Sequence, residues 1–237
     1  MKLRGDYHTH SIYSHGKGTI MENALSAKKA GLEELAITDH GYGHRLYAMK
    51  REALTQMRED AKIAERESNI KILIGAEANF TSPNGDIDLT PQDIENLDII
   101  LVGMHRFVKC KTKDFFTFFL PNILRKKASK NQIERNTTCI LNALDKYPID
   151  IITHPKYGMP FDVERVAKKA IEKGTLIELN ESKMCFSEEE IRLMVDLGVK
   201  FVINSDAHEP QKIGQTPKVF EIVEKYNIPK ENIFNLK

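Results

Sequence analysis

The chain lacks the cysteine patterns that build disulfide frameworks or thiolate metal sites. Its three cysteines, Cys110, Cys139 and Cys185, lie far apart and form no C-x-x-C motif. We therefore expect free thiols in a reducing cytosol, and with them a cytoplasmic location. The N-terminus has no apolar segment of the kind that forms a signal peptide, which agrees with that expectation.

The sequence also has little net charge and no long apolar run. Its 35 basic and 34 acidic side chains leave a formal net charge of +1, too little for an overall field that attracts nucleic acid or an anionic membrane. No apolar run approaches the ~18 residues that a transmembrane helix needs. We therefore expect neither nucleic acid nor a membrane as a partner, and any anion must be recognised locally. The oligomeric state stays open.

What the sequence does contain is a repeated alternation of short apolar runs and helical patterns, without linkers or low-complexity tracts. Several runs, such as residues 72–74 and 99–102, are continuously apolar, which is typical of parallel strands buried on both faces. We expect strands at residues 2–8, 34–38, 70–77, 97–105, 149–154, 175–180 and 200–205. Seven strands alternating with helices predict a single α/β domain over residues 1–237, folded as a TIM-like β/α barrel, with an open doubly wound sheet as the alternative.

Capping signals predict where several helices begin. The capping-box patterns that start at Thr19 and Ser187 each open a helix, and Asp162 can cap another. Charged residues interspersed with apolar ones predict a long amphipathic helix over residues 47–68. Residues 106–148 depart from this rhythm because they form a longer connection than the others, and we interpret them as an insertion.

Histidines gather at one end of the predicted strands. Of the eight histidines, five lie at the C-terminal end of a strand or within a few residues of it: His8, His40, His105, His154 and His208. His10 follows His8 by two residues, so both imidazoles point to the same side of an extended chain. His15 is either a ligand or a loop residue, and for His44 we favour the loop. Active sites of β/α barrels lie at this end of the barrel, so the clustering indicates a functional site.

Carboxylates at the same strand ends indicate that these histidines bind metal. Glu77 ends the third predicted strand, and Asp206 stands two residues before His208. Imidazole with carboxylate suits zinc, manganese or iron, and the absence of nearby cysteine argues against a closed structural zinc site. We expect Asp39 to orient an imidazole rather than to bind metal.

Together these motifs resemble the ordered motifs of the PHP (polymerase and histidinol phosphatase) superfamily. They are His8-Thr9-His10, Thr38-Asp39-His40, Gly75-Ala76-Glu77, Gly103-Met104-His105, Thr153-His154-Pro155 and Ser205-Asp206-Ala207-His208. The resemblance spans nearly the whole chain, and Ser14-His15-Gly16 is similar to the first loop of the short stand-alone bacterial PHP phosphatases. It implies a distorted seven-stranded β/α barrel with a dinuclear or trinuclear metal site.

The resemblance further implies how the ligands would be divided between two or three divalent metal ions. The first metal would be held by His8, His10, Glu77 and Asp206. The second would be held by Glu77, His105 and His154, and the third by His15, His40 and His208. Residue spacing alone neither allocates ligands between metals nor chooses among zinc, manganese and iron. The connection at 106–148 departs from the family because it is longer than in the compact members.

Clustered divalent metals lower the pKa of a bound water and clamp the oxygens of a phosphoryl group in transfer. We therefore predict a phosphatase that hydrolyses a small phosphomonoester by a metal-bound hydroxide, with Asp206 and His208 as candidate catalytic residues. The alternatives are a dedicated histidinol-phosphate phosphatase, a nuclease acting on phosphodiesters, an amidohydrolase-like enzyme, and a non-catalytic metal-stabilised module.

Two basic residues near the predicted ligands are candidates for binding the substrate phosphate. Arg106 directly follows His105 and offers a planar fork of donors to two phosphate oxygens, and Lys156 lies shortly after the fifth predicted strand. Arg106 also opens a basic stretch, because residues 106–130 contain eight basic side chains and one acidic one. The alternative is a solvated charged loop. The apolar run at 115–120 is expected to pack over the barrel mouth or against another subunit.

Overall fold

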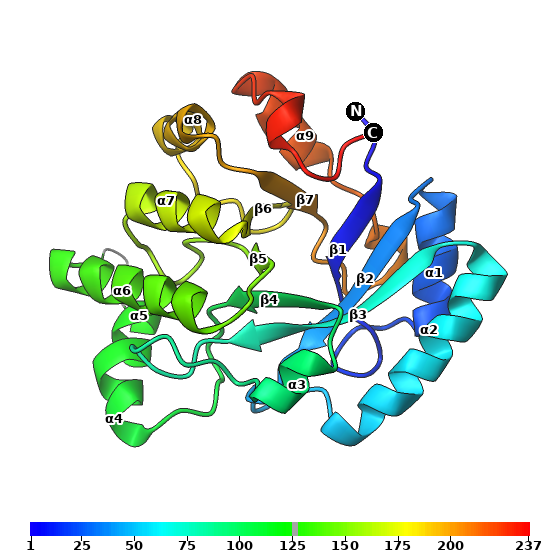
Figure 1. The fold of residues 1–237 in the computed structure, drawn as a ribbon, viewed down its shortest axis with the longest axis horizontal. Helices are drawn as coiled ribbons and strands as arrows, with labels where there is room; N and C mark the ends of the chain where they lie inside the picture. Colours follow the sequence, from blue (N-terminus) through cyan, green and yellow to red (C-terminus); the bar gives the residue numbers. More distant parts are fainter. Residues whose placement is uncertain (125–127) are drawn as a thin grey trace.

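The computed structural model describes residues 1–124 and 128–237. Seven parallel strands form one sheet in the order of the sequence. They are β1 (Gly5–Thr9), β2 (Glu34–His40), β3 (Lys71–Asn79), β4 (Ile99–Gly103), β5 (Ile151–Ile152), β6 (Leu176–Asn180) and β7 (Phe201–Asn204). Each connection between consecutive strands carries at least one helix on the outside of the sheet, as Figure 1 shows.

The sheet curls round until its first and last strands meet. The Tyr7 N–H donates to Asn204 Oδ1 at 2.9 Å, and the His10 N–H donates to the Ala207 carbonyl at 2.8 Å. Thr9 and Ala207 also form a parallel bridge. The sheet is therefore a nearly closed barrel, which confirms the predicted TIM-like α/β architecture over the open doubly wound alternative.

Both faces of the strands are buried, which explains the continuous apolar runs in the sequence. A small cluster of buried apolar side chains lies inside the barrel: Tyr7, Ala36, Ile99, Leu101, Ile151 and Val202. A much larger apolar cluster packs the outer face of the sheet against the helices. The inner cluster fills the barrel below its C-terminal end, so the polar side chains at that end pack against a layer of apolar side chains.

The helices surround the barrel (Figure 1). They are α1 (Ile20–Lys29), α2 (Leu54–Ser68), α3 (Pro91–Glu95), α4 (Thr112–Asp114), α5 (Leu120–Leu124), α6 (Lys130–Lys146), α7 (Val163–Lys173), α8 (Glu188–Leu197) and α9 (Pro217–Lys225). Short 3-10 turns are η1 (Arg51–Ala53), η3 (Pro210–Lys212) and η4 (Lys230–Asn232), and η2 (Phe115–Phe119) is π-helical. The predicted caps at Thr19, Ser187 and Asp162 are confirmed. Within the described residues, no helix combines the length and apolarity needed to cross a membrane.

The helix predicted over residues 47–68 begins later than expected, with η1 followed by α2. The Nδ1 atom of His44 accepts the backbone N–H of Tyr47 at 3.0 Å, and the Met49 N–H donates to the His40 carbonyl at 3.0 Å. These bonds hold the start of the segment in a loop at the barrel mouth, because they occupy backbone N–H groups that would otherwise donate within a helix.

The segment 106–148 contains α4, η2, α5 and α6, which follow one another on one side of the barrel in Figure 1. The last of these, α6, connects β4 to β5 as the other crossover helices connect their strands. Phe118 and Phe119 are buried, whereas Phe115 and Phe116 are 37% and 60% exposed. The apolar run is therefore only half covered. The basic cluster of this segment lies outside the described residues: Arg125, Lys126 and Lys127.

Candidate metal centre

The predicted ligands meet at the C-terminal end of the barrel because all seven strands point the same way. His40 ends β2, and its register partner on β3 is Glu77. The loop after β1 and the loop after β7 lie together, with the ring centroids of His10 and His208 only 4.3 Å apart. Closure of the barrel thus brings together predicted ligands that lie far apart in the sequence.

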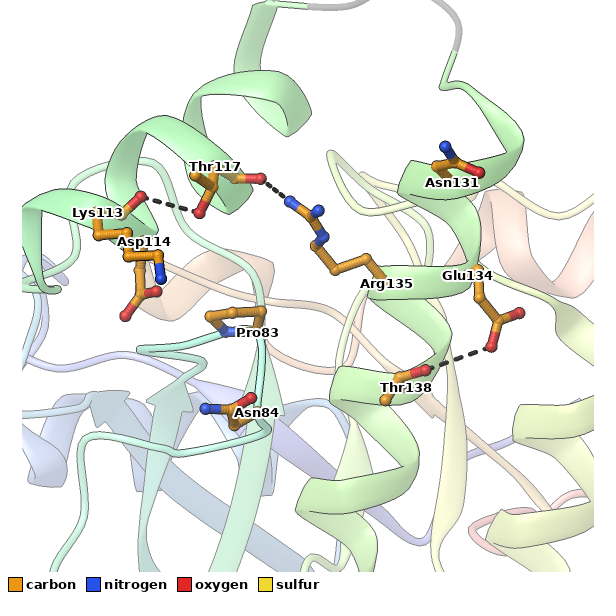
Figure 2. Close-up of a pocket in the computed structure, with 9 residues that line it drawn as sticks. All are labelled: Pro83, Asn84, Lys113, Asp114, Thr117, Asn131, Glu134, Arg135 and Thr138. Atoms are coloured by element: carbon orange, nitrogen blue, oxygen red, sulfur yellow. Dashed lines mark hydrogen bonds between the residues drawn. The ribbon is translucent and has the colours of Figure 1, made fainter.

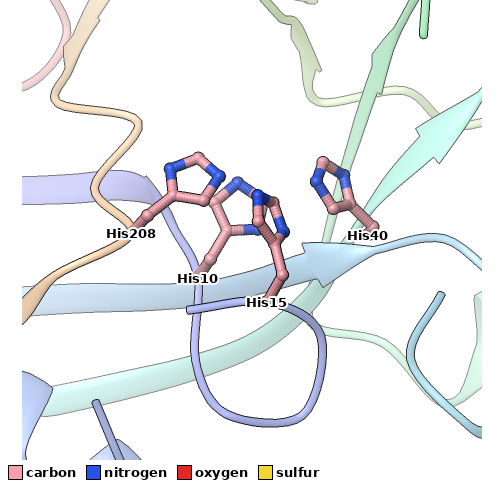
Figure 3. A group of neighbouring side chains, drawn as sticks. All are labelled: His10, His15, His40 and His208. Carbon is pink, nitrogen blue, oxygen red and sulfur yellow. The ribbon is translucent and has the colours of Figure 1, made fainter. Parts of the chain in front are cut away.

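The structure brings all nine predicted ligands into four overlapping groups, and the donor atoms of each group lie within 4.8 Å of one another. The groups are His10, His15, His40 and His208; His8, His154 and Asp206; His8, His10 and Glu77; and His40, Glu77 and His105. Figure 3 shows the first group, in which imidazoles from three separate loops and strand ends face one another. His15 thus lies among the predicted ligands rather than apart in its loop.

Glu77 lies at the centre of this cluster and is 1% exposed. Its Oε1 atom is 3.2 Å from the Nε2 atom of His8, 3.2 Å from that of His105 and 2.7 Å from that of His154. Its Oε2 atom is 2.8 Å from Nδ1 of His40. A carboxylate whose two oxygens face different histidines is placed to bridge adjacent cations.

Many donor atoms of the cluster are buried without a hydrogen-bond partner. These atoms include His8 Nε2, both ring nitrogens of His10, His15 Nδ1, His40 Nδ1, Glu77 Oε2, His105 Nε2, His154 Nδ1 and Asp206 Oδ1. A buried polar atom without a hydrogen-bond partner costs about 1–3 kcal/mol of stability. The large number of such atoms in one place therefore indicates that a ligand binds there. Imidazole nitrogens and carboxylate oxygens suit divalent transition metals, and the donor set therefore fits the metals that the sequence predicts.

Comparison with known proteins agrees with this chemistry. A model of the PHP domain matches residues 6–182. The chain belongs to the PHP family. Over 99% of its length it is 33% identical to a probable phosphatase of Caldanaerobacter subterraneus subsp. tengcongensis, of which it covers 89%. It is likewise 32% identical to a probable phosphatase of Clostridium novyi over 99% of its length, and it covers 91% of that protein. This PHP protein is a metal-dependent phosphoesterase, a hydrolase of phosphate esters.

Solved structures share the fold of this PHP protein. One is histidinol phosphate phosphatase from Lactococcus lactis, complexed with zinc, L-histidinol and phosphate; identity is 15%, the TM-score is 0.66, and 97% of this chain and 95% of that chain are covered. Another is a chain of archaeal ribonuclease P; identity is 14%, the TM-score is 0.57, and 97% of this chain and 85% of that chain are covered. At such identities the likeness shows the fold alone, so the reaction must be argued from the site.

A set of buried polar residues holds the predicted ligands in place. Glu178 on β6 bonds the Nδ1 atom of His8 at 2.8 Å, and Asn79 on β3 bonds the Nδ1 atom of His105 at 2.7 Å. Such bonds fix the ring orientation and leave the other ring nitrogen for a metal. Neither residue was predicted from the sequence, where the one signal for Glu178 is its position as a single acidic residue inside an apolar strand.

Asp39 orients the first loop rather than a ring directly. Its carboxylate accepts the Ser11 N–H at 2.8 Å and the hydroxyl groups of Ser11 and Ser14, while its nearest approach to Nδ1 of His10 is 4.0 Å. Because this loop also carries His15, Asp39 positions two of the predicted ligands through the backbone. It does not belong to the candidate metal groups of the described residues.

His44 is buried beside the cluster, with its ring stacked 4.9 Å from that of His40. Its Nδ1 atom accepts backbone N–H groups of the following loop. This agrees with the loop interpretation. The Tyr47 ring that follows stacks 4.4 Å from the His15 ring and covers that side of the site.

Burial and mutual charge shift the pKa values of the cluster strongly. Burial lowers the pKa of His15, His44 and His105 to about 4, so these imidazoles stay neutral, as His15 and His105 must be to bind metal. Burial by itself would raise the pKa of Glu77, but the imidazoles around it, His105 first, hold that pKa well below its usual value. Asp206 is likewise held ionised against its burial, first by His8.

We expect protein stripped of metal to lose stability as the pH falls through the window between 6.5 and about 4. In that window the unfolded chain protonates His15, His44 and His105 while the folded chain does not, so the free energy of unfolding falls with the pH. His8, whose pKa is raised by Glu178, opposes this trend, as do Asp6, Asp39, Asp88 and Asp150, whose pKa values are raised by burial. Urea unfolding of chelator-treated protein should show a lower midpoint at about pH 5 than at about pH 7. Equal midpoints would contradict the prediction.

The two predicted substrate-binding residues differ in their surroundings. Arg106 is exposed and lines a cavity of about 70 Å³ together with His105, Tyr157 and the second half of α5. Lys156 instead turns away, and its ammonium group contacts both carboxylate oxygens of Glu190 on α8 at 2.5 and 2.7 Å. Arg106 therefore remains available at the mouth, whereas the charge of Lys156 is already neutralised.

A second hollow lies on the flank of the barrel and is separate from the metal centre. This groove of about 670 Å³ runs between α4, η2 and α6, as Figure 2 shows. The Arg135 guanidinium donates to the Thr117 carbonyl across it, and Thr117 in turn donates to the Lys113 carbonyl at 2.9 Å. None of the nine predicted ligands lines the groove, so its volume does not mark it as the place of the reaction.

Proposed function

We propose that this PHP protein is a phosphomonoesterase that holds two or three divalent ions of zinc, manganese or iron and acts on a small phosphorylated substrate. The convergence of unpartnered buried donor atoms around Glu77 carries the proposal. Nine nitrogen and oxygen ligands are too many for one tetrahedral or octahedral ion, and one central carboxylate is suited to being shared.

Under this proposal the ligands divide as the resemblance implies. One ion takes His8, His10, Glu77 and Asp206; a second takes Glu77, His105 and His154; a third takes His15, His40 and His208. The grouping of donor atoms supports this division in part: His15, His40 and His208 share one group and His8, His10 and Glu77 another, whereas His154 groups with His8 and Asp206. The second set is supported by the distances from Glu77 Oε1 to the Nε2 atoms of His105 and His154, which are 3.2 and 2.7 Å. Zinc is the first ion to test, because the Lactococcus lactis phosphatase with this fold holds zinc.

Bound divalent ions at such a site lower the pKa of a coordinated water and neutralise the oxygens of the transferring phosphoryl group. The residues of the chain supply orientation and charge. Asp206 stays ionised and offers Oδ1 to the cluster. The carbonyl of Asp206 lies 2.9 Å from Nδ1 of His208, which leaves Nε2 of that ring for the cluster. The His208 side chain is 32% exposed, so this ring forms the solvent-facing edge of the cluster.

A phosphate-release screen tests the proposed function. Protein reconstituted separately with zinc, manganese and iron should release phosphate from generic aryl phosphates and from some sugar, amino-alcohol or nucleotide monophosphates. Hydrolysis confined to phosphodiesters would replace the proposal with a nuclease. Absence of hydrolysis of any phosphoester with all three metals would overturn the reaction class.

Metal content provides a second, independent prediction. Elemental analysis should find at least two divalent ions per chain, and His15→Ala should lose one ion and retain the others, because His15 belongs to only one donor group. Unchanged metal content in this variant would return His15 to the role of a loop histidine.

Arg106→Ala should lower kcat/KM by roughly tenfold or more, since a charge-assisted bond to phosphate is worth about 1.5–3 kcal/mol. Lys111→Ala is the matched control, because Lys111 is an exposed cation of the same segment. Steady-state kinetics at low and high salt should show a loss for Arg106→Ala that persists in salt. Equal small losses that vanish at high salt would indicate diffuse steering instead.

A further inference from the structure

We propose that Lys183, rather than Lys156, provides the lysine contact to the substrate phosphate. This inference rests on the proposed phosphomonoesterase function. The ammonium group of Lys183 lies 2.7 Å from Oδ2 of Asp206, so it touches a residue of the metal cluster directly. Lys156 is held instead by Glu190, which also accepts the Ser187 N–H at 2.9 Å at the start of α8.

The turn after β6 directs Lys183 over the barrel mouth. Asn180, the last residue of β6, accepts the backbone N–H groups of Ser182 and Lys183 at 2.9 and 3.0 Å. This side-chain turn reverses the chain at the strand end and brings Lys183 back toward the axis of the barrel. The lysine side chain is 26% exposed, and its ammonium lies 5.6 Å from the centroid of the Tyr157 ring.

The two oxygens of Asp206 face in different directions. Oδ1 is 3.4 Å from Nε2 of His10 and 3.5 Å from Nε2 of His8, and it has no hydrogen-bond partner. Oδ2 accepts from Lys183 and, at 3.3 Å, from the side-chain amide of Asn180. Oδ1 is therefore left for a metal, whereas Oδ2 holds the lysine. The positive charge of Lys183 thus lies directly beside the proposed metal cluster, separated from it only by the carboxylate of Asp206.

A cation at this position can stabilise the transition state of phosphoryl transfer. Negative charge spreads over three equatorial oxygens of the transferring group, and cations beside the metals neutralise the oxygens that the metals do not bind. A lysine ammonium carries three donors, and Asp206 takes one of them. The remaining donors can reach a phosphate oxygen without breaking the bond to Asp206. The Tyr157 ring also lies beside the ammonium.

The test compares Lys183→Met with Lys183→Arg and Lys156→Met, and uses Lys200→Met as the neutral control because Lys200 bonds the Glu231 carbonyl, outside the metal cluster. Metal content is measured first by elemental analysis. Calorimetry then gives the affinity of the metal-loaded protein for inorganic phosphate, and kinetics with an aryl phosphate gives kcat and KM.

We expect Lys183→Met to keep the wild-type metal content but to bind inorganic phosphate at least about tenfold more weakly, as loss of one charge-assisted bond implies. Lys183→Arg should restore part of the affinity, and Lys156→Met and Lys200→Met should change it less than about threefold.

Three results would overturn the inference. Lys183→Met could bind phosphate as the wild type does, Lys156→Met could weaken binding as much as Lys183→Met, or Lys183→Met could lose metal, which would make Lys183 a support for Asp206 only. Each of these leaves the phosphatase proposal standing if the wild type remains active. A metal-loaded wild type that hydrolyses no phosphomonoester would instead remove the proposed function itself.

Discussion

Replacing His10 or Asp206 with alanine should abolish phosphoesterase activity and leave the barrel folded. Both side chains present unpartnered donor atoms to the cluster. Loss of groups that merely support metal ligands already costs roughly 10–100-fold, so loss of a ligand should lower kcat/KM by more than about 100-fold. Both residues lie beyond the strands, above the apolar floor of the barrel, so circular dichroism should still show a folded protein.

His44→Ala is the matched control for this prediction. Its imidazole is buried and stacked on His40, but it is absent from the donor groups of the described residues. We expect it to retain its metals and to lose less activity than His10→Ala. If His10→Ala and Asp206→Ala kept wild-type turnover on a generic aryl phosphate, the site would be in the wrong place.

Removing the metals should lower the melting temperature by on the order of 10 °C. A ligand present at about 1,000 times its dissociation constant stabilises the folded state by about 4 kcal/mol. For a domain of this size, 1 kcal/mol shifts the melting temperature by roughly 2–4 °C. Calorimetry of the protein before and after treatment with a chelator measures the shift directly.

Glu77→Gln should remove most of this metal-dependent shift, because one neutral amide replaces the carboxylate that contacts four histidines. Glu34→Gln is the matched control. Glu34 begins β2 at the opposite end of the barrel, where it accepts the Tyr7 hydroxyl at 2.5 Å, and this variant should keep the full shift. A chelator effect of wild-type size in Glu77→Gln would exclude Glu77 as a shared ligand.

The residues of the cluster could be predicted from the sequence because the parallel topology brings them together. Parallel strands place all their C-terminal ends at one rim, where His40 ends β2, Glu77 lies in the last part of β3, and Asp206 follows β7. Caps at Thr19 and Ser187 were equally predictable, since a capping box is a local pattern with a local cause.

Other features depend on contacts that no local pattern encodes. Glu178 bonds His8 across 170 residues of sequence, and its strand is buried on both faces, so the apolar pattern does not reveal which side chains point inward. Lys156 and Lys183 both follow strand ends, yet one turns to α8 and the other to Asp206. That difference arises from turn geometry, including the positive φ of 68° at Lys156, which the residue type does not predict.

The closure of the barrel between β1 and β7 also bears on how the protein is made. His8 and His10 precede Asp206 and His208 by nearly the whole length of the barrel, so they are synthesised well before them. Contacts such as that between Asp6 and Ser205 link residues 199 positions apart, and such distant pairings form late. The early histidines therefore leave the ribosome long before their partners. Until residue 208 has emerged, the nascent chain lacks part of the predicted metal cluster, so a centre of the proposed composition is complete only after β7 and the loop that follows it have been translated.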